Sequence, residues 1–72
     1  MSHTQMLKLL ARNVKKLRSR LDISQEVLAM NADIDRTYVS QIERAIGNPS
    51  VLILVKISNA LHVDVPYLFS KH

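Results

Sequence analysis

The sequence predicts an all-α fold in which five short helices form one domain. A chain of 72 residues leaves room for a single hydrophobic core and no second one. Apolar residues recur at the i, i+3, i+4 and i+7 spacing of helices, whereas the period-two alternation of strands is almost absent. Turn and cap residues interrupt this pattern repeatedly, which predicts short loops. We therefore expect one helical domain over residues 1–72.

The first predicted helix runs from Gln5 to Leu21, with Thr4 as its N-cap. An apolar stripe follows one side of it, formed by Leu7, Leu10, Val14, Leu17 and Leu21. Basic residues fall on the opposite side: Lys8, Arg12, Lys15 and Lys16. Arg18 lies only about 60° from the centre of the stripe, a position where a charge needs a partner.

Four further helices follow from the same periodicity and from cap residues. They are expected at residues 25–31, 36–45, 51–61 and 65–69, and their N-caps are Ser24, Asp35, Ser50 and Asp64. Asp33 tolerates the left-handed backbone that a tight turn between the second and third helices requires. The strongest turn signal of the chain, Gly47-Asn48-Pro49, separates the third helix from the fourth.

Composition and charge exclude several classes of function. The chain has no cysteine and a single glycine, which rules out disulfides, thiolate zinc sites and glycine-rich phosphate loops. The three histidines are too scattered to form a metal site, and no spacing suggests a nucleophile with its base: His3, His62 and His72. The longest apolar run is far too short to span a membrane, and we expect no signal peptide, because the sequence does not open on a charged segment followed by an apolar one. We expect a cytoplasmic protein that is not an enzyme and has no cofactor.

The basic residues are concentrated at one end of a chain whose formal net charge is +4. Residues 1–20 hold six basic residues and no acidic one: Lys8, Arg12, Lys15, Lys16, Arg18 and Arg20. Such a face is either simply solvated or attracts a polyanion such as nucleic acid. Charge alone leaves both interpretations open.

The second and third predicted helices have the spacing of a helix-turn-helix, about residues 24–45, whose second helix enters the major groove of DNA. On the third helix, Val39 and Ile42 point to one side. The opposite face is polar and carries Arg36, Thr37, Ser40, Gln41 and Arg44. Arginine can pair with guanine and glutamine with adenine, and threonine or serine can reach either base or touch a thymine methyl group. The alternative is an ordinary amphipathic helix with a solvated polar face.

Three segments of the sequence resemble the phage-repressor (Cro/cI-like) helix-turn-helix family: residues 24–29, 34–44 and 48–50. The similarity extends over about residues 14–69. Residues 36–40 and 42–44 most resemble the controller proteins of restriction–modification systems. Those proteins are small homodimers that bind paired operator sites and time expression of their own gene and of the endonuclease.

The resemblance implies roles for individual residues. Base contacts are expected from Arg36, Thr37, Tyr38, Ser40 and Gln41. Phosphate contacts are expected from Ser24 and Gln25, and we add Lys16, Arg44 and Asn48 as further phosphate contacts. The family also pairs positions 18 and 43, which implies a structural ion pair between Arg18 and Glu43.

Two residues depart from the family pattern after the third helix. Ala45 and Ile46 stand where the family usually has a glycine and a basic residue. We expect Ala45 to lengthen the third helix. Ile46 removes one possible phosphate contact from the following loop.

The fourth helix is apolar on nearly every side, which is typical of a helix that is covered on more than one face. Val51, Leu54, Val55, Ser58 and Leu61 are expected to face the core. A second copy of the chain is expected to cover residues within a dimerisation region of about 51–69: Leu52, Ile53, Ile57, Val65, Leu68 and Phe69. The alternative is that these are isolated surface residues without a partner.

Together these features predict a homodimeric transcriptional regulator that binds near-palindromic double-stranded DNA. It would control its own gene and a restriction endonuclease gene, and it would need no small-molecule ligand. One alternative is an antitoxin-type repressor that binds a toxin and its own promoter. A second alternative is a basic helix that lies on an anionic membrane, but the apolar stripe of the first helix is needed for the core.

Overall fold

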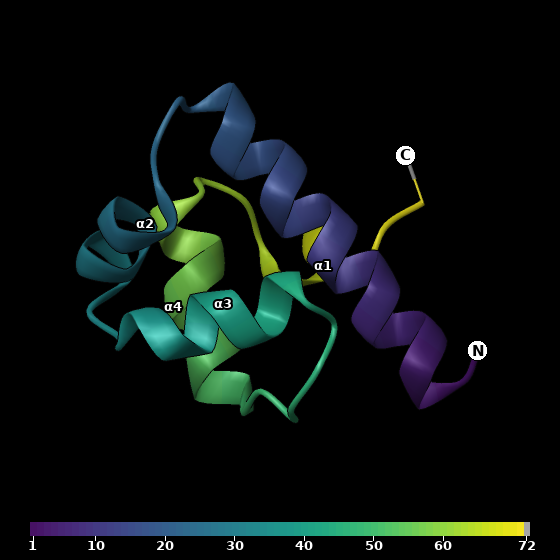
Figure 1. Cartoon of the computed structure of the whole chain (residues 1–72). Coiled ribbons are helices and arrows are strands. Elements are labelled where there is room, and N and C mark those ends of the chain that lie inside the picture. Colours follow the sequence, from purple (N-terminus) through teal and green to yellow (C-terminus); the bar gives the residue numbers. More distant parts are fainter. Residues whose placement is uncertain (72) are drawn as a thin grey trace.

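The computed structural model describes residues 1–71 and contains five helices in that range, without any strand (Figure 1). They are α1 (His3–Arg20), α2 (Gln25–Ala32), α3 (Arg36–Glu43), α4 (Val51–Ala60) and α5 (Val65–Leu68). The predicted all-α class is therefore confirmed, and each helix lies within two residues of its expected position.

One hydrophobic core joins the five helices. The long helix α1 packs against α3 and α5, while α2 packs against α3 and α4, and α5 also contacts α4 (Figure 1). The predicted stripe of α1 supplies Leu10, Val14 and Leu17 to this core, and Leu28, Val39 and Ile57 enter it from the other side. This arrangement leaves one side of α3 in solvent.

Every helix begins at a residue whose side chain caps it. Ser24, Asp35, Ser50 and Asp64 each accept a hydrogen bond from a backbone N–H of the first turn, as predicted. The prediction for α1 was wrong, because Ser2 and not Thr4 is its N-cap. Ser2 and Gln5 form a reciprocal capping box, which satisfies two backbone N–H groups and starts the helix earlier.

Each of the first four helices is followed by a residue in left-handed conformation, and none of these residues is glycine: Asp22, Asp33, Ala45 and His62. For Asp33 this conformation was expected. Ala45 was expected to lengthen α3, but α3 ends at Glu43 and Ala45 turns the chain with a φ of 57°. Left-handed backbone crowds the Cβ of alanine against its own carbonyl and costs roughly 1–2 kcal/mol.

Helix α4 is rotated relative to the expected orientation. Val51 and Val55 were assigned to the core, but they are exposed, Val51 by 74%. Ile57 was assigned to the surface, but it is completely buried among core residues. Leu54, Ser58 and Leu61 face the core as predicted. A helix that is apolar all round offers no periodicity by which a sequence could orient it.

The end of the chain is attached to the middle of α1 through Asn13. This residue has no solvent-exposed surface, and its Nδ2 donates hydrogen bonds of 2.8 Å to the backbone carbonyls of Leu68 and Ser70. Its Oδ1 has no hydrogen-bond partner. The bonds satisfy the Leu68 carbonyl, which the end of α5 leaves open, and the Ser70 carbonyl just beyond the helix.

Candidate nucleic-acid interface

The exposed face of α3 carries the residues that were predicted to contact bases. Arg36, Thr37 and Tyr38 are exposed, whereas Ser40 and Gln41 are half-buried. Arg36, Thr37, Ser40, Gln41 and Arg44 line one shallow hollow. Val39 and Ile42 are buried and anchor the helix. The structure thus brings four of the five predicted base-contact residues onto one surface, together with Arg44.

Tyr38 does not line this hollow and lies at the edge of α3 that faces the α3–α4 loop. It lines a second hollow with Gln41, Asn48 and Leu52. Gln41 borders both hollows. Its side chain lies over Gly47, because a Cβ placed on Gly47 would stand 3.4 Å from the Gln41 Oε1 atom. Gly47 has a φ of +80°, a conformation that glycine adopts without strain, so this residue provides the turn on which Gln41 rests.

The start of α3 is fixed by its cap. The Asp35 carboxylate accepts a 2.8 Å hydrogen bond from the backbone N–H of Thr37, and this bond lowers the pKa of Asp35 below its ordinary value. The cap is therefore fully charged in neutral solution and weakens only when acid protonates the carboxylate. Within α3 the one acidic residue, Glu43, is buried, so the solvent-exposed surface of that helix carries no negative charge.

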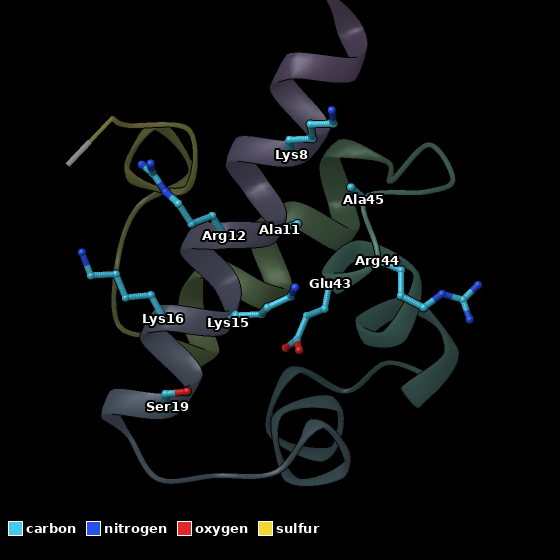
Figure 2. Close-up of a pocket in the computed structure, with 9 residues that line it drawn as sticks. All are labelled: Lys8, Ala11, Arg12, Lys15, Lys16, Ser19, Glu43, Arg44 and Ala45. Carbon is cyan, nitrogen blue, oxygen red and sulfur yellow. The ribbon is translucent and has the colours of Figure 1, made fainter.

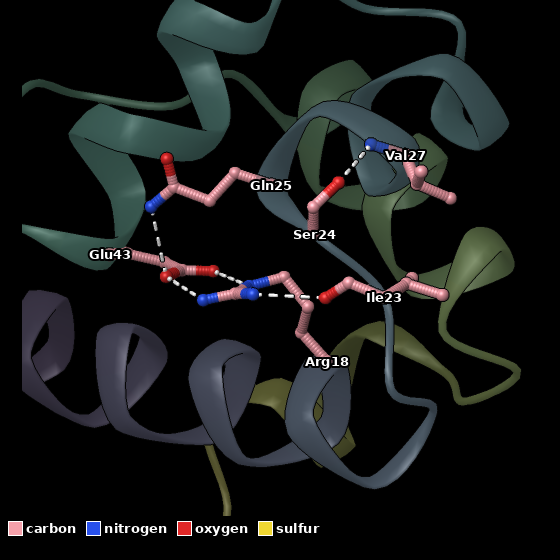
Figure 3. A network of polar contacts seen from close by, with 6 residues as sticks. All are labelled: Arg18, Ile23, Ser24, Gln25, Val27 and Glu43. Carbon is pink, nitrogen blue, oxygen red and sulfur yellow. Dashed lines mark hydrogen bonds and ion pairs between the residues drawn. The ribbon is translucent and has the colours of Figure 1, made fainter.

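A buried polar cluster holds the end of α3 against α1 and α2 (Figure 3). The Arg18 guanidinium donates two hydrogen bonds to the Glu43 carboxylate, of 2.6 Å and 2.9 Å, and a third of 2.9 Å to the carbonyl of Ile23. The Gln25 amide donates to the same carboxylate over 3.1 Å. The Glu43 side chain is 4% exposed and that of Arg18 is 22% exposed. The hydrogen bonds with Glu43 raise the pKa of Arg18.

The residues predicted to contact phosphates fall into three places. Ser24 and Gln25 begin α2, where the Ser24 hydroxyl caps the helix by accepting from Val27 N (Figure 3). Asn48 lies exposed in the α3–α4 loop, and Arg44 lies exposed after the last residue of α3. Lys16 is on α1, and its side chain extends toward the flank of α1 that is remote from α3 (Figure 2).

Two lysines that were not predicted as contacts lie closer to α3. Lys8 and Lys15 project from the side of α1 that faces the end of α3, near Ala45 and Glu43 respectively (Figure 2). They are seven residues apart and therefore on one line of the helix, whereas Lys16 is about 100° away from Lys15. Buried Ala11, on the same side, marks the direction of α3. The sequence offers only the spacing of Lys8, Ala11 and Lys15 beside the apolar stripe, and the structure is needed to show that α3 lies on this side.

The residues predicted for a dimer interface divide into two groups. Leu52 is 63% exposed, and Ile53, Val65 and Phe69 are half-buried. Ile57 and Leu68 are wrong as interface residues, because both have 0% exposure and belong to the core of the single chain. A charge at Leu68 would disrupt that core and could not report on dimerisation.

Among residues 1–71, no helix has the length and apolar character needed to cross a bilayer. In the same range, no three histidine or acidic side chains come together as a metal site. His72, one of the three scattered histidines, lies outside the described residues.

Comparison with known proteins identifies the family. The helix-turn-helix family model matches residues 14–68. Control protein C.MunI of Mycoplasma sp is 47% identical over 58 residues, which are 79% of this chain and 78% of that protein. Control protein C.BamHI of Bacillus amyloliquefaciens is 45% identical over 57 residues, which cover 78% of this chain and 70% of the relative.

A solved structure agrees with these matches. The restriction–modification controller protein C.AhdI from Aeromonas hydrophila superposes with a TM-score of 0.82 at 33% identity, covering 88% of this chain and 96% of that one. The predicted resemblance to controller proteins is therefore confirmed. The family consists of DNA-binding transcriptional regulators and not of enzymes. The chain belongs to the helix-turn-helix family.

Proposed function

We propose that this protein is a sequence-specific regulator that binds double-stranded DNA operators and controls its own gene together with a restriction endonuclease gene. The observation that carries the proposal is the exposed face of α3, which offers arginine, threonine, serine and glutamine donors without an exposed acid. These are the side chains that read base edges in the major groove. The names of the relatives favour a controller over an antitoxin. Such a protein would act in the cytoplasm, where its DNA lies.

Arg36 is the proposed guanine reader, because it stands exposed in the first turn of α3. The test selects duplexes from a randomised pool with the wild-type protein and footprints the region upstream of its own gene. Arg36→Ala should lose about 1–3 kcal/mol per half-site and relax the preference at one base position. Arg44→Ala is the matched control, because it removes one arginine at a proposed phosphate contact. It should weaken binding to all DNA sequences alike. Equal losses on selected and random DNA would demote Arg36 to a phosphate contact.

Specific binding by a single α3 would cover only a few base pairs, so we propose a two-fold dimer on a near-palindromic site. The proposed interface joins Leu52 and Ile53 of α4 to Val65 and Phe69 around α5. Val51 and Val55 are also exposed, and helical spacing places them beside Leu52 on α4. Exposed apolar residues gathered on one helix are typical of a protein–protein interface.

Leu52→Asp tests the dimer because Leu52 is largely exposed and contributes little to the core. The variant should remain folded but sediment as a monomer at micromolar concentration, and it should keep only weak, salt-sensitive DNA binding. Met30→Asp is the control, because Met30 is a similarly exposed apolar residue on α2. If Leu52→Asp remained dimeric, or if a stable monomer still bound a symmetric operator tightly without sigmoidal titration, the proposed dimer would be wrong.

A further inference from the structure

An open hollow of about 740 Å³ lies between the middle of α1 and the end of α3 (Figure 2). Its charged lining contains five cationic side chains and one carboxylate: Lys8, Arg12, Lys15, Lys16, Arg44 and Glu43. Ala11 and Ala45 also line it, and their small side chains leave the space between the charges open. Lys16 and Arg44 are predicted phosphate contacts, but no role described above accounts for Lys8 and Lys15.

The carboxylate in the hollow does not neutralise its lysines. Glu43 is buried and already receives two hydrogen bonds from Arg18 and one from Gln25. Neither Lys8 nor Lys15 forms an ion pair with an acidic residue in the part of the chain that the structure describes. Both side chains are exposed, so their charges are available to an anion from outside.

The hollow is continuous with the face of α3 that is proposed to read bases. Arg44 lines both this hollow and the hollow that contains Arg36 and Gln41. The ammonium groups of Lys8 and Lys15 lie on the side of α1 that faces α3, whereas Arg12 and Lys16 extend toward the other flank (Figure 2). A cationic path therefore leads from the reading face across Arg44 to α1.

We propose that the phosphodiester backbone of the duplex beyond the bases read by α3 lies in this hollow and is bound by Lys8 and Lys15. The proposal rests on the proposed DNA-binding function and extends the contact surface onto α1. A repeated anion matches two lysines and an arginine spread along an open hollow better than a single small anion would. An acidic protein segment would meet the same charges, but the continuity with the reading face favours DNA.

The test compares the salt dependence of DNA binding between variants. The probe is a 30-base-pair duplex selected from a randomised pool by the wild-type protein. Lys8→Gln/Lys15→Gln removes two charges inside the hollow, and Lys71→Glu removes the same net charge at an exposed position outside it. Each lost phosphate contact should reduce the slope of log K against log salt by about 0.9. In the proposed dimer the double variant loses four such contacts, two from each protomer, so its slope should be shallower by about 3.6, and Lys71→Glu should keep the wild-type slope.

A second probe, trimmed to the selected bases, sharpens the result. On the trimmed duplex the difference between wild type and double variant should disappear, because the flanking phosphates are gone. Thermal unfolding checks that both variants remain folded.

Equal slopes for the double variant and Lys71→Glu on the long probe would overturn the proposal. The proposal would also be wrong if the wild type bound polyglutamate, the double variant did not, and both bound DNA equally well. That result would assign the hollow to an acidic protein segment. If the wild type selected no sequence at all, the proposed function itself would fail.

Discussion

Helix α1 contributes to two buried polar clusters that differ in kind. Near its end, Arg18 joins Glu43, Gln25 and the carbonyl of Ile23, so that charged and neutral groups from three helices meet (Figure 3). In its middle, Asn13 uses one amide group to bind two carbonyls at the end of the chain and leaves its own oxygen without a partner. The hydrogen bonds of the first cluster join α1 to α2, to α3 and to the loop after α1. Those of the second cluster join α1 only to the end of the chain.

The difference between the two clusters corresponds to the segment that each one fixes in place. The Arg18 cluster lies behind the proposed reading face, where a small rotation of α3 would displace every side chain directed at a base. Beside Asn13, buried Leu68 already anchors α5 through packing. Asn13 therefore only has to satisfy the carbonyls of Leu68 and Ser70. Breaking the first cluster should therefore impair both stability and DNA binding, whereas breaking the second should impair stability alone.

Among the substitutions that test this comparison, Glu43→Gln should have the largest effect on stability and on DNA binding. Removing one partner of a buried pair strands the other charge and costs about 3–5 kcal/mol, so both the melting temperature and the affinity for selected DNA should fall. Arg18→Met/Glu43→Leu is the control, because apolar replacement of both partners should recover most of the stability. Unchanged melting temperature and affinity in Glu43→Gln would show that the pair has no structural role.

Asn13→Leu should have an intermediate effect. The change leaves the carbonyls of Leu68 and Ser70 without the Asn13 amide, which costs about 1–3 kcal/mol, although it also removes an unpartnered buried oxygen. Urea unfolding measures the loss. Affinity for selected DNA, measured where the variant is folded, should equal that of the wild type. A loss of affinity as large as that of Glu43→Gln would remove the distinction between the two clusters.

Ala45→Gly should have the smallest effect and the opposite sign. Glycine relieves the left-handed strain directly after the Arg18 cluster, and the greater entropy of glycine in the unfolded chain offsets part of that gain. A net stabilisation of about 0.5–1 kcal/mol is expected from thermal unfolding. Ala60→Gly, at the helical end of α4, is the matched control and should lose a similar amount. Destabilisation by Ala45→Gly would mean that the strain at this position is absent.

Several turns, caps and charge positions near the proposed interface could be predicted from the sequence, whereas the orientation of α4 could not. The turn at Asp33, the cap at Asp35 and the position of Arg18 beside an apolar stripe are local features, and each of them has a periodic or conformational signature. The orientation of α4 had none, which is why Ile57 was placed outside and Val51 inside.

Two further features depend on the fold and not on local sequence. Asn13 is next to Val14 of the stripe, but its hydrogen-bond partners lie 55 and 57 residues away. Leu68 was assigned to an interface because it lies among apolar residues, and only packing against the rest of the chain distinguishes it from Phe69. Sequence spacing contains no information about contacts of this range.

The side chains of Arg36 and Ser40 have a consequence for how such a protein can change over generations. Neither forms a hydrogen bond with another side chain in the described residues, and the Asp35 cap and the Arg18 cluster hold α3 at its two ends instead. Substitutions at these two positions should therefore cost little folding free energy. A lineage can acquire a new operator preference by substitutions on this face while its scaffold stays the same, and recognition and architecture can evolve separately.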